Sequence, residues 1–369
     1  MSHTLPTETS PATTLGTPVS WADPARAAMF AHWLGGISLA QQLVPATLRF
    51  AAADADFRRY LRIDTSAGSS RIIMDAPPDK LDTLSFVKIA DLFRSAGLHT
   101  PRVLAWDQAL GFMLLTDLGR HTMMDQLNPG DAQANLPRYL QAVDELIKLQ
   151  TASRPDVLPP YNDALLRREL QLFPDWYVAQ HRGITLSAAQ KAVLGKAFAS
   201  IVADNLATPS VYVHRDFMPR NLMATTPDSL GVLDFQDAVY GPVTYDIASL
   251  MRDAFLSWEE DFVLEVTVRY WERARKVGLM NHDDWHGNFG AFYRAVEYMG
   301  LQRHLKVAGI FARLTLRDGK AKYLADAPRF INYIRATAHR YRELGPLLKL
   351  MDEIEGNDTA NTWIFGRPA

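Results

Sequence analysis

The two halves of this 369-residue chain carry different hydrophobic periodicities, and this contrast constrains the fold more than any other feature. The first half alternates short β-rich runs with helical patterns, whereas nearly all of residues 245–351 follow amphipathic helical spacing. A sheet-based unit followed by a helical unit is the arrangement that such a pattern predicts. We therefore expect an α+β, bilobal fold with a small antiparallel-sheet N-lobe and a larger, mainly helical C-lobe.

Local signals give the borders of the expected elements. In the first half they indicate strands at residues 61–63, 72–74, 102–106 and 112–115, and a helix from Ser85 to residue 96. In the second half, helical periodicity covers residues 136–149, 164–179 and 187–206. The chain passes between the halves at residues 116–119, which form the candidate hinge.

Two carboxylates and one amide follow strand-like runs in the second half. The run VYVHRDFMPRN at residues 211–221 fits the kinase catalytic loop H-R-D-x-x-x-x-N. In such a loop Asp216 accepts or orients the proton of an acceptor hydroxyl, and Asn221 coordinates magnesium. Asp234 ends a second run, GVLD, 13 residues after Asn221, where it would bridge magnesium to nucleotide phosphates. The two motifs in this order predict a protein-kinase-like fold that uses ATP and Mg²⁺.

Departures from a protein kinase indicate a small acceptor. Gln236 replaces the glycine of D-F-G, no A-P-E follows, and Asp246 comes only 12 residues after Asp234. This spacing leaves too little chain for a regulated activation loop that also holds a peptide, so we expect a small-molecule substrate. Asp246 is expected to begin a helix and to hydrogen-bond back to the catalytic loop in a structural role, and His214 and Arg215 are expected to be scaffold.

The nucleotide-binding residues are less clearly marked, because the chain has neither a G-x-G-x-x-G loop nor a V-A-I-K lysine. Arg58 or Arg59, in the glycine-free run of residues 53–60, would add positive charge for a phosphate, or both are solvated strand residues. Asp75 stands where the phosphate-pairing lysine is expected. The positive charge must then come from an arginine, from Lys80 or from the metal ions.

At this point a resemblance can be named. The stretches HRDFMPRNLM and GVLDFQDAVYGPVTYDIASL resemble the aminoglycoside phosphotransferase and choline kinase superfamily. From about Trp21 onward the chain is similar, more closely, to the anomeric N-acetylmuramate/N-acetylglucosamine kinases of peptidoglycan recycling. The matching stretches are DADFRRYLR, IIMDAPP, LLRRELQLFPDWYV and LQRHLKVAGIFARL. The resemblance implies phosphate transfer from ATP to the C1 hydroxyl of the sugar, which gives the α-1-phosphate on the way to UDP-N-acetylmuramate.

The resemblance also implies roles. Asp216 would be the base, the backbone of Asp117 and Leu118 would receive the adenine, and an aspartate at position 75 belongs to the family pattern. From composition and periodicity, we expect residues 1–20, which are rich in Pro, Thr and Ser, to be a disordered tail. Residues 21–118 are then the nucleotide-binding N-lobe, and residues 119–369 the helical C-lobe with the catalytic loop and the sugar site.

The sugar contacts are inferred from chemistry. Gln236 and Asp237, directly after the metal aspartate, are best placed for sugar hydroxyls. A guanidinium is the best geometric partner for the lactyl carboxylate of N-acetylmuramate, and Arg168 and Arg303 lie in family-like helical segments. The alternative enzyme is an aminoglycoside or choline-type kinase, whose cationic acceptor calls for an acidic or aromatic pocket. The alternative of another class is a kinase-like binding module without turnover.

Composition excludes several classes of protein and site. Lysine plus arginine (39) nearly balances aspartate plus glutamate (41), so the chain has no basic field for nucleic acid. The absence of cysteine excludes disulfides and thiolate nucleophiles. No apolar run is long enough to span a bilayer, and the N-terminus does not read as a signal peptide. We therefore expect a cytoplasmic monomer that has no membrane, nucleic-acid or obligate protein partner.

Overall fold

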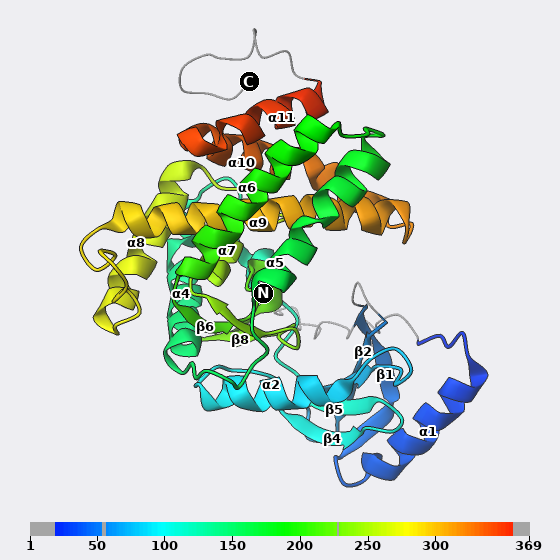
Figure 1. The fold of residues 1–369 in the computed structure, drawn as a ribbon. Coiled ribbons are helices and arrows are strands. Elements are labelled where there is room, and N and C mark those ends of the chain that lie inside the picture. Colours follow the sequence, from blue (N-terminus) through cyan, green and yellow to red (C-terminus); the bar gives the residue numbers. More distant parts are fainter. Residues whose placement is uncertain (1–18, 54–56, 227–228, 357–369) are drawn as a thin grey trace, which may run out of the picture. The chain divides into compact units, whose positions relative to one another are not determined.

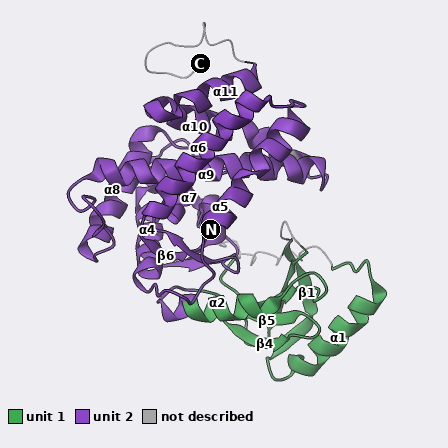
Figure 2. Cartoon of the chain, in the orientation of Figure 1, with its two compact units in different colours: residues 1–92, 100–119 green, residues 93–99, 120–369 purple. Residues whose placement is uncertain are grey.

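The computed structural model describes residues 19–53, 57–226 and 229–356. The chain divides into two compact units (Figure 2). Unit 1 comprises Met1–Leu92 and Thr100–Gly119, and unit 2 comprises Phe93–His99 and Arg120–Ala369. Except for its last two residues, the tail expected at residues 1–20 lies outside the described part of the chain. The functional lobe borders expected from the sequence stay a prediction.

Unit 1 is built on a five-stranded antiparallel sheet with the strand order β1-β2-β3-β5-β4 (Figure 1). Its strands are β1 (Leu43–Ala53), β2 (Arg59–Thr65), β3 (Ser70–Asp75), β4 (Val103–Asp107) and β5 (Phe112–Thr116). The four strands expected from the sequence are confirmed. Gly68 lies in the turn between β2 and β3 with φ of 79°, a backbone conformation that glycine adopts at little steric cost. Helix α2 (Thr83–Ser95) confirms the helix expected from Ser85.

Two elements of unit 1 had no clear sequence signal. Helix α1 (Pro24–Ser38) and strand β1 precede the first expected strand. Phe30, Trp33 and Leu34 of α1 pack into the core that Leu61 and Phe112 of the sheet help to form. Aromatic and branched side chains of this size contribute roughly 1.5–3 kcal/mol each when they are fully buried. Helix α1 is therefore part of the core of unit 1.

Unit 2 is mainly helical (Figure 1). Its main helices are α4 (Leu136–Thr151), α5 (Asp163–Leu170), the π-helix η2 (Phe173–His181), α6 (Ala188–Ala207), α7 (Tyr245–Met251), α8 (Glu260–Lys276), α9 (Phe289–Leu316), α10 (Ala327–Arg340) and α11 (Gly345–Glu355). The 28-residue helix α9 contacts α5, α6, α7, η2 and α10. Because α9 is surrounded in this way, it buries charged residues such as Glu297, Arg303 and Lys306 as well as its apolar ones. Within the described residues, no helix is both long and apolar enough to cross a membrane.

The single helix expected at residues 164–179 is wrong in one respect, because the segment contains two helices. Helix α5 ends at Leu170, and Pro174 lies in the first turn of η2. Proline has no N–H group to continue a helical ladder but fits a first turn. The two residues between α5 and η2, Gln171 and Leu172, form a linker. Gly309 of α9 packs closely against this linker, since a Cβ atom at Gly309 would lie 2.4 Å from the carbonyl carbon of Leu172. Helices α4 and α6 confirm the other two expectations.

Candidate active site

Two short, two-stranded antiparallel sheets in unit 2 carry the predicted chemical residues. Strand β6 (Ser210–Val213) pairs with β9 (Val239–Pro242), and β7 (Leu222–Thr226) pairs with β8 (Ser229–Val232). Asn221 directly precedes β7, and Asp234 follows the end of β8 by two residues. The hairpin register and the hydrogen bond from Leu233 N to Asn221 O (2.9 Å) therefore bring the two motifs together.

The three residues expected at the chemical centre lie together. The Asn221 amide nitrogen donates to the backbone oxygen of Asp216 (2.9 Å) and to Asp234 Oδ2 (3.3 Å). Gln236 Nε2 donates to Asp234 Oδ1 (2.8 Å). Asp234 has φ of 62°, which a residue with a Cβ atom adopts at a cost of roughly 1–2 kcal/mol. Such strain persists only where the surrounding contacts determine the conformation.

The donor set fits a magnesium ion. The Asn221 amide nitrogen is occupied by two acceptors, so its oxygen is the atom left for a cation. Together with the carboxylate of Asp234 it supplies the hard oxygen ligands that Mg²⁺ prefers, and Mg²⁺ takes its remaining ligands from water and substrate phosphates. Asp216 is half-buried beside them. When bound, the ion would neutralise charge on the transferred phosphoryl group.

His214 and Asp246 hold the predicted catalytic loop through hydrogen bonds, in the structural roles that were expected for them. Both carboxylate oxygens of Asp246 accept backbone N–H groups, from His214 (2.7 Å) and from Arg215 (3.0 Å). Asp246 lies in the first turn of α7. Burial raises the pKa of Asp246, whereas these donors and the nearby charge of Arg303 favour its ionised form.

The His214 ring is held as a neutral imidazole. The N–H of Asp216 points to His214 Nδ1 (3.3 Å), so Nδ1 is the acceptor and Nε2 carries the proton that it donates to Leu233 O (2.9 Å). Burial lowers the pKa of His214 to about 4, although the charge of Asp216 acts in the opposite direction. The ring therefore supports the loop and is uncharged at neutral pH.

In unit 1 the predicted Arg59 and the unpredicted Arg26 both contact Asp75. The guanidinium of Arg59 donates to Asp75 Oδ2 (3.0 and 2.5 Å), and that of Arg26 donates to Asp75 Oδ1 (3.1 and 2.6 Å). Asp75 is only 2% exposed. One carboxylate thus aligns two guanidinium groups, and the cluster keeps one net positive charge. Arg26 lies on α1. Because the sequence did not predict this helix, it also did not predict that Arg26 reaches Asp75.

The other predicted nucleotide residues are also well defined. Arg58 is buried. The Asp117 carboxylate accepts Arg62 Nε (2.6 Å) and Ser70 Oγ (2.6 Å), and these contacts lower its pKa although burial raises it. The side chain of Leu118 is buried. These contacts fix the end of β5, which would carry the hinge backbone.

The four predicted sugar residues have different surroundings. Gln236 is bound to Asp234, and its Oε1 is buried without a hydrogen-bond partner in the described part of the chain. Asp237 is exposed in the same loop, and Arg168 is exposed on α5. Arg303 is buried, and its Nη1 donates to the backbone oxygen of Arg215 (2.7 Å). The structure thus brings Gln236 and Arg303 to the loops of the site, whereas Arg168 lies on a helix surface.

Sequence reasoning missed Glu169, the neighbour of Arg168. Its carboxylate forms an ion pair with Arg215 of the catalytic loop and another with Lys306 of α9 (3.0 Å). The hydroxyl of Tyr161 also donates to it. Burial raises the pKa of Glu169, but the charges of Lys306 and Arg215 lower it further, to about 2. Its sequence signal was weak: an acidic residue directly after two arginines, Arg167 and Arg168, in a family-like stretch.

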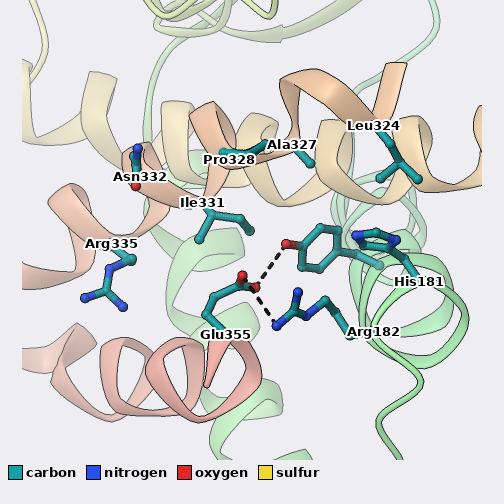
Figure 3. Close-up of a pocket in the computed structure, with 10 residues that line it drawn as sticks. His181, Arg182, Leu324, Ala327, Pro328, Ile331, Asn332, Arg335 and Glu355 are labelled. Carbon is teal, nitrogen blue, oxygen red and sulfur yellow. Dashed lines mark hydrogen bonds and ion pairs between the residues drawn. The ribbon is translucent and has the colours of Figure 1, made fainter. Parts of the chain in front are cut away.

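A separate cavity of about 260 Å³ lies among η2, η4 (Ala321–Asp326), α10 and α11 (Figure 3). Its charged side chains are paired with acidic neighbours: Arg182 lies 3.9 Å from Glu355, and Arg335 contacts Asp352. Tyr177 also donates to Glu355 (3.0 Å). None of the predicted site residues lines this cavity.

Comparison with known proteins identifies the family of this chain. A family model described as the phosphotransferase enzyme family matches residues 47–285. The chain is 49% identical to a protein of Neisseria meningitidis named N-acetylmuramate/N-acetylglucosamine kinase, over 85% of this chain and 92% of the relative. It is 47% identical to a protein of the same name from Pseudomonas aeruginosa, over 84% of this chain and 89% of the relative. The resemblance stated from the sequence is thereby confirmed.

A solved structure supports the fold assignment. A choline/ethanolamine kinase family protein from Mesorhizobium loti aligns with a TM-score of 0.56 and 15% identity, over 88% of this chain and 99% of that one. At this identity the likeness shows the fold alone, and it confirms the kinase-like α+β fold. On the family match and the identity to these relatives, the chain is a phosphotransferase and belongs to the phosphotransferase enzyme family.

Proposed function

We propose that this protein transfers the γ-phosphate of ATP, with Mg²⁺, to the C1 hydroxyl of N-acetylmuramate, of N-acetylglucosamine or of both. The product would be the sugar α-1-phosphate, which a nucleotidyltransferase would use in cell-wall recycling toward UDP-N-acetylmuramate. The observation that carries the proposal is the identity of 49% and 47% to relatives named for these sugars, over about nine-tenths of their lengths. A cytoplasmic, monomeric enzyme is part of the proposal.

The chemical roles follow from the donor set. Asp216 is the residue that would orient the sugar hydroxyl and accept its proton, while Asn221 and Asp234 would hold magnesium. An anomeric hydroxyl is more acidic than an ordinary alcohol, so the main task of Asp216 is orientation. The contacts of Asn221 support this assignment, because its side-chain amide binds both the backbone oxygen of Asp216 and the carboxylate of Asp234.

The nucleotide would bind through residues of unit 1. Arg59, aligned by Asp75, is the cation best prepared for a phosphate, since its side chain is still 30% exposed. Arg58 would add charge beside it, and the backbone of Asp117 and Leu118 would receive the adenine. Asp75 therefore acts through the arginines and needs no phosphate contact of its own.

The sugar would meet Gln236 and Asp237. The unpartnered Oε1 of Gln236 is an acceptor that a sugar hydroxyl can satisfy. Arg168 and Arg303 remain the candidates for the lactyl carboxylate. Arg303 already donates to Arg215 O through Nη1, so a sugar would have to use its other N–H groups.

Phosphorus NMR of the reaction product tests the proposal. The protein is incubated with MgATP and, separately, with N-acetylmuramate, N-acetylglucosamine, choline and kanamycin. A sugar α-1-phosphate doublet from either amino sugar is the expected result, and the relative rates identify the preferred substrate. A product from choline or kanamycin alone would discard the cell-wall role and favour the alternative enzyme. No product from any acceptor would favour a binding module.

A further inference from the structure

The residue before Asp216 has an unfavourable backbone conformation that the proposed roles do not explain. Arg215 has φ of 75°, in the left-handed region that residues with a Cβ atom rarely adopt. The peptide group between Arg215 and Asp216 sets the direction in which the Asp216 side chain leaves the loop. Something must therefore hold Arg215 in this conformation.

The backbone of Arg215 is held on both sides. Its N–H donates to Asp246 Oδ1 (3.0 Å), and its carbonyl oxygen accepts Arg303 Nη1 (2.7 Å). Arg303 is itself buried, with its guanidinium 4.8 Å from the ring centre of Tyr245. These two contacts fix the peptide groups, but they do not engage the charge of Arg215.

The guanidinium of Arg215 is held by Glu169, which lies 46 residues away on α5. Glu169 is only 5% exposed. Its carboxylate is itself fixed by Lys306 Nζ (3.0 Å), by the Tyr161 hydroxyl and by Gln302 Nε2 (3.2 Å). Each of these groups is on α9 or on the segment just before α5. The anion that faces Arg215 is therefore rigidly placed by the helical core.

We propose that Glu169 is a positioning residue that holds Arg215 in its left-handed conformation and so orients Asp216 for phosphate transfer. The proposal rests on the proposed function for its kinetic readout. Protein kinases order their loops through new arginine–phosphate pairs after phosphorylation. Here a buried carboxylate supplies the anion permanently, which is consistent with the short stretch between Asp234 and Asp246. The catalytic loop then needs no covalent switch.

The central test replaces Glu169 by glutamine, which keeps the shape and removes the charge. We expect kcat to fall about 100-fold, as for a small misplacement of a reacting group, while the KM for MgATP stays within about twofold. The kcat value is normalised to the number of MgATP sites counted by calorimetry, so unfolded protein does not contribute. Asp163→Asn is the matched control, because Asp163 pairs with an arginine on the exposed face of the same helix and its loss should leave kcat unchanged.

A second pair of variants separates positioning from a purely structural ion pair. If Glu169 acts through Arg215, the double variant Glu169→Gln/Arg215→Gln should lose no more kcat than Arg215→Gln alone. The variant Glu169→Gln leaves two buried cations unpaired and could therefore fold poorly. In that case the double variant Glu169→Gln/Lys306→Met takes its place in the test, because it removes one positive charge together with the negative one.

Hydrogen exchange of the loop gives a readout besides activity. In Glu169→Gln, the backbone amides of residues 214–218, 220 and 221 should exchange faster, whereas those of α10 should not change. Unchanged kcat per binding site, strictly additive losses in the double variant or unchanged exchange in the loop would each overturn the proposal. If the wild type phosphorylates a different acceptor, the proposed function fails, but the same comparison on that acceptor still decides the role of Glu169.

Discussion

The neutral state of His214 makes the stability of this protein sensitive to mild acid. The ring is fully buried, and its Nδ1 faces the N–H of Asp216. A proton on Nδ1 would place two donors against each other without solvent. The pKa of His214 is lowered to about 4 in the folded protein, first by burial, whereas an unfolded histidine titrates near pH 6.5. Between these values the unfolded chain binds one more proton than the folded chain.

The sign and size of the effect follow from this difference. A histidine with a lowered folded-state pKa leaves stability intact above about pH 6.5, and the stability falls as the pH decreases toward 4. Each pH unit in this window costs about 1.4 kcal/mol, so a change from pH 7 to pH 5 should cost the folded state about 2 kcal/mol through His214 alone. Such a loss is a large part of a typical total stability of about 5–15 kcal/mol.

Urea unfolding at pH 7 and pH 5 isolates this contribution when the wild type is compared with His214→Gln. The glutamine Nε2 can still donate to the Leu233 carbonyl, but the side chain does not titrate. The variant should be less stable at pH 7, yet its loss of stability on going to pH 5 should be smaller than that of the wild type by about 2 kcal/mol. Equal losses in the two proteins would refute the view that a neutral His214 is built into the loop.

Three further outcomes are expected. Asp216→Ala should abolish turnover but leave MgATP affinity unchanged in calorimetry, whereas Asp234→Ala should also weaken metal-dependent nucleotide binding; similar affinities in both variants would contradict the assigned roles. Asp75→Asn should destabilise unit 1 by about 3 kcal/mol in urea unfolding, because two guanidinium groups lose their carboxylate, and a loss below about 0.5 kcal/mol would argue against this cluster as a structural element. Gly309→Ala should destabilise by about 1–3 kcal/mol because its Cβ atom would meet the Leu172 backbone, whereas Gly195→Ala, with open space around it on α6, should stabilise by about 0.5–1 kcal/mol; equal shifts in melting temperature would show that α9 does not pack closely on the linker.

Much of unit 1 could be predicted because its strands are short, β-branched and separated by turn residues. The strands expected at 61–63 and 72–74 pair with each other, with Leu61 opposite Ile73. Helix α1 was missed because its apolar residues bury one face of the sheet without a strong amphipathic repeat in the sequence. The break after α5 was missed because the helical spacing of apolar residues in the sequence continues across Pro174.

The sequence alone was enough to predict the proposed chemical centre. Asp216, Asn221 and Asp234 lie within 19 positions of one another, and a short hairpin is enough to bring them together, so local spacing carries the information. Only the tertiary structure decided which groups support that centre. Glu169 reaches Arg215 across 46 residues, Arg26 reaches Asp75 across 49, and Arg303 reaches the Arg215 carbonyl across 88. Such pairs depend on how helices pack, and a buried charge has no periodicity or spacing that would reveal its partner.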